Sequence, residues 1–157
     1  MKKIVAVLMM FGAVLMAGAA PAAGELLTGK WFVGKGISAT VEKSGVVKFA
    51  RTEGQGSWIA TTRFKPETGA TYRLEMKLTD VPEGARVEVI VRYNKEGGKE
   101  RMNFKPAQDA DGVLAVDETF TVSANCKFAE VSVWCSRSAE GDLLELGKCS
   151  VKKVEKK

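Results

Sequence analysis

Eight consecutive residues indicate the fold class: Thr71-Tyr72-Arg73-Leu74-Glu75-Met76-Lys77-Leu78. Polar and apolar side chains alternate along them, which is the pattern of a β-strand with one buried and one open face. The same period of two runs through residues 86–93 and 129–135. In these two stretches Ile90 and Trp134 place apolar side chains on the otherwise polar face. We therefore expect a domain built from half-buried strands.

Shorter alternating stretches and turn signals surround these three segments. Further strands are expected at residues 37–41, 46–51, 58–64, 101–104, 119–122 and 143–154. The last should break at Gly147, where a bulge would keep Cys149 and Val151 on the buried side. No stretch shows a convincing period of 3.6, although the long connection 105–117 has room for one turn of helix. The pattern predicts an all-β domain, a two-sheet antiparallel jelly-roll β-sandwich of about eight or nine strands.

The chain begins with the pattern of a cleavable signal peptide. Lys2 and Lys3 precede an uncharged apolar run, which ends in small residues around Ala20-Pro21-Ala22. The run is short for a membrane span, so cleavage after Ala22 is expected rather than a retained anchor. The remaining chain divides into a lead-in at 23–35, the β-sandwich at 36–154 and a basic tail at 155–157. We expect a secreted or periplasmic protein with no membrane attachment after cleavage.

The charge of the exported domain is mixed. The chain has 24 basic and 19 acidic side chains, a formal charge of +5, which falls to +3 once Lys2 and Lys3 are removed. Such a balance is typical of a solvated surface, so neither nucleic acid nor a membrane is expected as a partner.

Three cysteines lie in the last quarter of the chain, at positions 126, 135 and 149. In an oxidising compartment they predict one disulfide and one free or buried thiol. A Cys135–Cys149 bond is favoured, because both residues share the parity of the buried side chains on their strands. A bond between Cys126 and Cys149, and three buried thiols, stay open as alternatives. Without histidine or a C-x-x-C pair, no zinc site is expected.

Catalytic residue patterns are scarce. The absence of histidine excludes Ser-His and Cys-His nucleophile pairs, and the domain is expected to be non-enzymatic. Two carboxylates among Glu75, Glu88 and Glu130 could still support glycoside hydrolysis, although cross-strand ion pairing is the favoured explanation for them. The stretch 109–112, Asp-Ala-Asp-Gly, is half of a calcium loop. No cofactor is expected, with structural calcium as the only alternative.

The aromatic residues favour a binding site. Parity places Trp134 on the open face of its strand, as it does Arg92 and Glu88 on theirs, and Asn103 is expected on the open face of another. Flat aromatic rings stack on sugar C–H faces, while charged and amide groups bind sugar hydroxyls. These four residues predict a saccharide site. The alternative for Trp134 is that the N-terminal segment or the 105–117 loop covers it. Trp31 and Trp58 are expected to anchor loops, with ligand contacts at the rim of a site as the alternative.

The order of these elements resembles a known family. The segments that carry the resemblance are 36–41, 45–49, 56–60, 64–74 (with Pro66-Glu67-Thr68-Gly69 before Tyr72-Arg73-Leu74), 120–122, 129–133 and 141–154. They are similar to carbohydrate-binding modules of the family 4/9 type, which have a galactose-binding-like jelly-roll fold. The closing strand of that family often carries an Asp-Asp pair, where Leu144-Glu145 stands here. The resemblance implies a non-catalytic module for a glycan or polysaccharide; the alternative is a structural or adhesion sandwich that docks another protein.

Overall fold

The computed structural model describes residues 25–27 and 29–155, so the expected signal peptide at 1–22 lies outside the described residues. Eleven strands form the fold: β1 (Phe32–Val33), β2 (Ile37–Val41), β3 (Val47–Arg51), β4 (Gly56–Phe64), β5 (Thr71–Thr79), β6 (Val87–Lys95), β7 (Gly98–Phe104), β8 (Ala107–Gln108), β9 (Leu114–Thr121), β10 (Ala129–Ser138) and β11 (Leu143–Lys153). Within the described ranges there is no helix, and hence none long and apolar enough to cross a membrane.

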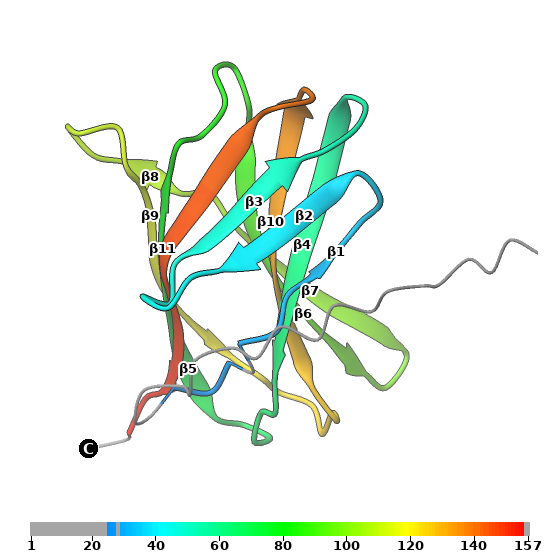
Figure 1. Cartoon of the computed structure of the whole chain (residues 1–157). Coiled ribbons are helices and arrows are strands. Elements are labelled where there is room, and N and C mark those ends of the chain that lie inside the picture. The colour runs from blue at the N-terminus through cyan, green and yellow to red at the C-terminus, as the bar shows by residue number, and fades with distance from the viewer. Residues whose placement is uncertain (1–24, 28, 156–157) are drawn as a thin grey trace, which may run out of the picture.

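The strands form two antiparallel sheets packed face to face (Figure 1). One sheet has five strands in the order β1-β4-β10-β6-β7, and the other has six in the order β2-β3-β11-β5-β9-β8. The chain repeatedly changes sheet between consecutive strands, as from β4 to β5 and from β10 to β11. The expected jelly-roll β-sandwich is confirmed. The strand number exceeds the prediction partly because β1 and β8, two residues each, are too short to show alternation.

The core lies between the two sheets and follows the alternation in the sequence. Leu74, Met76 and Leu78 of β5 are almost completely buried, as are Val131 and Val133 of β10. A fully buried aliphatic side chain of this kind stabilises a fold by roughly 1.5–3 kcal/mol relative to an exposed one. The inward sides of the two sheets are therefore fixed by packing, which leaves the outward sides for charge or binding.

Two local predictions had different outcomes. The bulge expected in the last strand is confirmed, since the register between β11 and β5 shifts between Leu146 and Lys148. The connection 105–117, which had room for a turn of helix, forms none, because β8 pairs with β9 in a hairpin there. The Asp109 carboxylate closes this hairpin by accepting hydrogen bonds from the backbone N–H groups of Asp111 and Val113.

The predicted Cys135–Cys149 disulfide is absent, and all three cysteines are free thiols. Both side chains do face inward, as their parity indicated. However, Cys135 is near Arg51 and Asp142 at the β10–β11 turn, whereas Cys149 lies much farther along β11, near Glu25. A disulfide requires Cα atoms about 4.4–6.8 Å apart. Shared parity could not reveal this offset along the strands.

Candidate functional site

The outer face of the five-stranded sheet combines aromatic, charged and amide side chains. Its central residues lie on four neighbouring strands in matching register: Ile59, Thr61 and Arg63 of β4; Glu130, Ser132 and Trp134 of β10; Glu88, Ile90 and Arg92 of β6; and Arg101 and Asn103 of β7. Side chains opposite one another on neighbouring strands are separated by about 5 Å at Cβ, so they can act on one ligand.

All four residues of the predicted saccharide site lie on this face. Trp134 is the register partner of Glu88, and Arg92 lies farther along the same strand as Glu88. Nδ2 of Asn103 donates a hydrogen bond to Oε2 of Glu88 (3.3 Å), and Nε of Arg101 donates to Oδ1 of Asn103 (2.8 Å). Trp134 is partly exposed and therefore not completely covered. The geometry brings the four together, and their role in binding stays a prediction.

The side chains at the centre of this face are buried, and hydrogen bonds hold the polar ones. Ser132 and Ile90 are buried although they point away from the core between the sheets. The Ser132 hydroxyl forms a hydrogen bond with that of Thr61 (2.9 Å), and Nη2 of Arg92 lies 3.4 Å from the same Ser132 oxygen. The longer side chains around them therefore pack on an ordered base. This limits the side-chain conformational entropy that is lost when a ligand binds.

A row of charges crosses three of the strands. Glu130 lies between Arg63 and Arg92: Nη2 of Arg63 is 2.8 Å from its Oε1, and Nη2 of Arg92 is 3.2 Å from its Oε2. One carboxylate thus orients two guanidinium groups. This arrangement assigns Glu130 a positioning role rather than the role of a free catalytic acid.

Two exposed phenylalanines were missed by the sequence analysis. Phe32 of β1 is 53% exposed and Phe128, just before β10, is 38% exposed. The Cζ atom of Arg63 lies 5.0 Å from the centre of each ring, so both rings make cation–π contacts with it. Parity with Glu130 and Trp134 could have placed Phe128 on this face, whereas Phe32 lies in the lead-in without a recognisable pattern.

Two hollows adjoin Arg63 and Phe128. One of about 180 Å³ is also lined by Arg92, Lys99 and Glu130. The other, of about 590 Å³, is formed with the β9–β10 connection and includes Lys65, Asn125, Cys126 and Lys127. Both adjoin the exposed Phe128 ring, so an extended ligand could contact them together.

On the outer face of the six-stranded sheet, several charges are paired across neighbouring strands. Nη2 of Arg73 lies 2.5 Å from Asp117, and Nζ of Lys148 lies 3.1 Å from Glu75. The Lys148 hydrogen bond, with the charges of Lys148 and Arg73, holds the pKa of Glu75 below its ordinary value. Such a network of cross-strand ion pairs is typical of a solvated sheet face.

This placement argues against the two-carboxylate alternative. Glu75 lies on the outer face of the six-stranded sheet and Glu88 on that of the five-stranded sheet, so they point to opposite sides of the sandwich. Glu88 and Glu130 share a face, but Glu88 pairs with Trp134, four positions along β10 from Glu130. At roughly 3.3 Å per residue this offset is about 13 Å, longer than the carboxylate separations used in glycoside hydrolysis.

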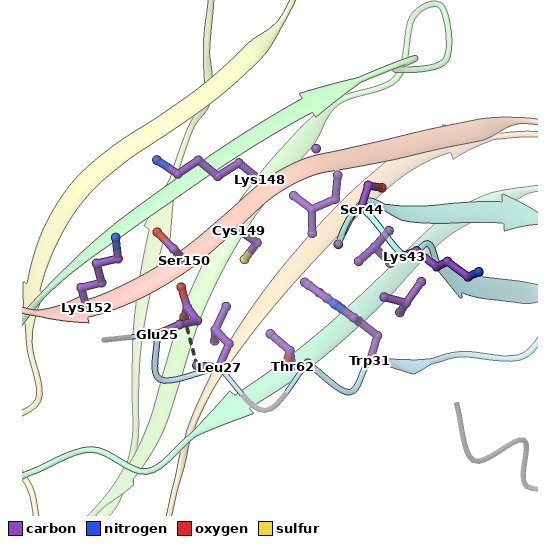
Figure 2. Close-up of a pocket in the computed structure, with 16 residues that line it drawn as sticks. Glu25, Leu27, Trp31, Lys43, Ser44, Thr62, Lys148, Cys149, Ser150 and Lys152 are labelled. Atoms are coloured by element: carbon purple, nitrogen blue, oxygen red, sulfur yellow. Dashed lines mark hydrogen bonds between the residues drawn. The ribbon is translucent and has the colours of Figure 1, made fainter. Parts of the chain in front are cut away.

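A separate cavity of about 390 Å³ opens at one edge of the sandwich (Figure 2). Leu27, Trp31, Thr62 and Cys149 contribute to its walls. Oε1 of Glu25 accepts hydrogen bonds from the N–H groups of Leu26, Leu27 and Val151 and fixes the N-terminal segment beside β11. Burial raises the pKa of the Cys149 thiol, and the nearby Glu25 carboxylate raises it further. Several polar groups that line this cavity thus already form contacts within the protein.

Trp31 and Trp58 act as anchors, as expected. Their rings pack against Phe49 at centroid distances of 5.2 and 5.4 Å. Neither stands on the outer face of the five-stranded sheet with Trp134.

The residues that the structure describes include no group of three or more histidine, cysteine, aspartate or glutamate side chains placed to hold a metal ion. The Asp109 carboxylate of the predicted half calcium loop is engaged with backbone N–H groups of its own turn.

No protein-family model matches the sequence, and no curated protein sequence matches it significantly. Solved structures are nevertheless similar in fold. The module TmCBM61, solved in complex with β-1,4-galactotriose, gives a TM-score of 0.51 at 12% identity, over 84% of this chain and 92% of that one. The C-terminal family 22 carbohydrate-binding module of Clostridium thermocellum Xyn10B gives 0.53 at 9% identity, over 85% of this chain and 97% of that one.

The enzymatically active domain of tailspike protein 4 from bacteriophage CBA120 gives a TM-score of 0.55 at 9% identity, over 84% of this chain. This chain spans only 20% of that one. At such identities the likeness concerns the fold alone. The chain has the jelly-roll fold of carbohydrate-binding modules, and its relation to the 4/9 type in particular stays a prediction.

Proposed function

We propose that this protein is an exported, non-catalytic module that binds a glycan on the outer face of the five-stranded sheet. The observation that carries the proposal is the register of Trp134 beside Glu88, with Asn103 and Arg101 linked to Glu88 by hydrogen bonds. An indole offers a platform for the C–H face of a sugar ring, and the polar groups beside it can bind the hydroxyls at its rim.

The fold supports this assignment. Similar structures include modules whose names state that they bind xylan, and one solved with a galactotriose. The contrast between the two outer faces supports it as well. The two phenylalanines among the exposed large hydrophobic residues of the described chain, Phe32 and Phe128, both flank Arg63 on the five-stranded sheet.

Affinity gel electrophoresis of residues 23–157 against a panel of soluble polysaccharides tests the proposal. Retardation by at least one polysaccharide, weakened in Trp134→Ala but not in Lys77→Gln, is the expected result. Lys77 is exposed on the opposite sheet and serves as the control. Circular dichroism verifies that each variant is folded. Unretarded protein that instead co-purifies with a protein partner would favour the structural or adhesion alternative.

Export is part of the same proposal and has its own test. Mass spectrometry of the protein recovered from producing cells should give the mass of residues 23–157. Recovery of the full 157-residue chain from the membrane fraction would contradict cleavage after Ala22.

A further inference from the structure

We propose that the preferred ligand of this face is an anionic glycan, whose carboxylate or sulfate groups bind around Phe128. The inference rests on the proposed glycan-binding function and adds the chemical class of the ligand. It arises from a concentration of positive charge that becomes visible only when the strands are assembled.

The two hollows beside Phe128 collect most of the excess charge of the domain. Their charged lining residues are Arg63, Lys65, Arg92, Lys99 and Lys127, with Glu130 as the single carboxylate. Five cations and one anion give this patch a formal charge of +4. The chain after cleavage carries only +3 in total, so the rest of the domain is slightly acidic.

Ion pairs within the protein do not neutralise most of these cations. Glu130 is the one acidic neighbour of both Arg63 and Arg92. Within the described residues, no carboxylate lies within 4.0 Å of the amino groups of Lys65, Lys99 or Lys127. These lysines are exposed. In addition, the buried Nε of Arg92 finds no hydrogen-bond partner in the described part of the chain.

Several basic side chains on the opposite side of the molecule are, by contrast, paired with carboxylates. Arg73, Lys48 and Lys148 on the six-stranded sheet each have a carboxylate within 3.1 Å. Lys77 and Lys152 of that sheet also have no carboxylate within 4.0 Å in the described part of the chain, but they do not lie around an exposed aromatic ring as Lys65, Lys99 and Lys127 do. A patch of this kind attracts anions and accelerates their association.

The aromatic rings indicate a sugar rather than another polyanion. Arg63 lies between the rings of Phe32 and Phe128, and the ammonium of Lys127 is 5.6 Å from the centre of the Phe128 ring. A uronic acid or a sulfated sugar presents an apolar ring face and an anionic group in one unit, which matches a ring flanked by cations. The same sheet face continues to Trp134, where further sugar units of the chain could bind.

Two matched pairs of polysaccharides test the inference. Polygalacturonate and its fully methyl-esterified form share a backbone and differ in carboxylate charge, and κ-carrageenan and its chemically desulfated form share a backbone and differ in sulfate charge. We expect at least one anionic member to bind about tenfold more tightly than its neutral partner at low salt, and the preference to shrink in about 0.5 M NaCl. Which pair shows it distinguishes carboxylate from sulfate.

The variant that tests the patch is Lys99→Gln/Lys127→Gln, in which neither side chain has an ion pair to lose. It should lose about fivefold to tenfold in affinity for the anionic glycan, while Lys77→Gln on the other sheet changes nothing. Equal binding of both members of each pair would overturn the inference and leave the proposed function standing. Equally tight binding of single-stranded DNA would overturn it in favour of general polyanion binding. Binding to no polysaccharide would overturn the proposed function itself.

Discussion

Trp134 and Glu88 are register partners on β10 and β6, so an indole and a carboxylate stand side by side on the outer face of the five-stranded sheet. Asn103 holds the carboxylate through a hydrogen bond to Oε2, and Arg101 in turn holds Asn103. The platform and its polar neighbours are thus arranged before any ligand arrives. Ordered side chains of this kind lose little entropy on binding, which favours affinity.

The Glu88–Asn103 contact should matter for ligand binding more than for folding. Both side chains are solvent-accessible, so Asn103→Ala is expected to change the free energy of unfolding by less than about 0.5 kcal/mol. It should weaken glycan binding severalfold, because Glu88 loses the group that orients it. Isothermal titration calorimetry and urea unfolding measure the two effects. A variant that is clearly destabilised but binds normally would show that Asn103 serves the fold alone.

Two adjacent threonines provide a matched test of internal polarity. The Thr62 hydroxyl is buried and has no hydrogen-bond partner among the described residues, whereas the Thr61 hydroxyl pairs with Ser132. Thr62→Val should therefore stabilise the protein by about 1 kcal/mol, since it removes an unsatisfied polar group. Thr61→Val should destabilise it by a similar amount. Urea unfolding measures both, and a loss of stability in Thr62→Val would indicate that the hydroxyl does have a partner in solution.

Glu130 should stabilise the sheet by separating two arginines. Glu130 lies on β10 between Arg63 of β4 and Arg92 of β6. Glu130→Ala removes the carboxylate that separates the two guanidinium groups. Because both pairs are partly exposed, we expect a loss of only about 1 kcal/mol in the free energy of unfolding. The loss should be smaller in high salt, and an unchanged stability would contradict a positioning role for this residue.

The Arg73–Asp117 pair gives a pH dependence of known sign. The hydrogen bonds from Arg73 hold the pKa of Asp117 below its ordinary value of 3.8. A carboxyl group whose pKa is depressed in the folded state stabilises the fold above its unfolded pKa, and this stability is lost as the pH falls through the folded value. Asp117→Asn should therefore flatten the acid limb of the stability curve below about pH 4. Arg73→Gln should have a similar effect, and an unaltered acid limb in both variants would contradict the pairing.

The thiols should be distinguishable by reactivity. Burial, with a smaller contribution from Asp142, raises the pKa of Cys135 to about 11, so little thiolate forms there near neutral pH. In the native protein a thiol reagent should react with Cys126 well before Cys135, because Cys126 is partly exposed whereas Cys135 is buried. After unfolding without reductant, three thiols should react. A count of one would show that the exported protein does form a disulfide.

The fold could be predicted because burial imposes a period of two on a strand. Leu74, Met76 and Leu78 reveal their side of β5 without any knowledge of the partner strands. The same parity placed Trp134, Glu88, Arg92 and Asn103 on the open faces of their strands. It could not show that these strands are neighbours in one sheet. That depends on sheet order, which brings β10 between β4 and β6.

Other features could not be predicted for the same reason. The basic patch joins Lys65, Lys99 and Lys127 from three distant segments, and no local pattern marks them. The position of a residue along its strand is equally invisible, which is why Cys135 and Cys149 share a side of the sandwich but not a bond. The parity of a residue predicts the side of the sheet on which it lies. Only the strand register predicts its neighbour on the next strand.

The location of the binding site is tested most directly by a nuclear magnetic resonance titration that follows the three tryptophan indole N–H signals. With a polysaccharide fragment that retards the protein, the Trp134 signal should shift, while those of Trp31 and Trp58, which pack against Phe49, should stay in place. A shift of the Trp31 signal alone would move the site to the edge cavity. Binding that leaves all three signals unchanged would contradict a glycan site that includes Trp134.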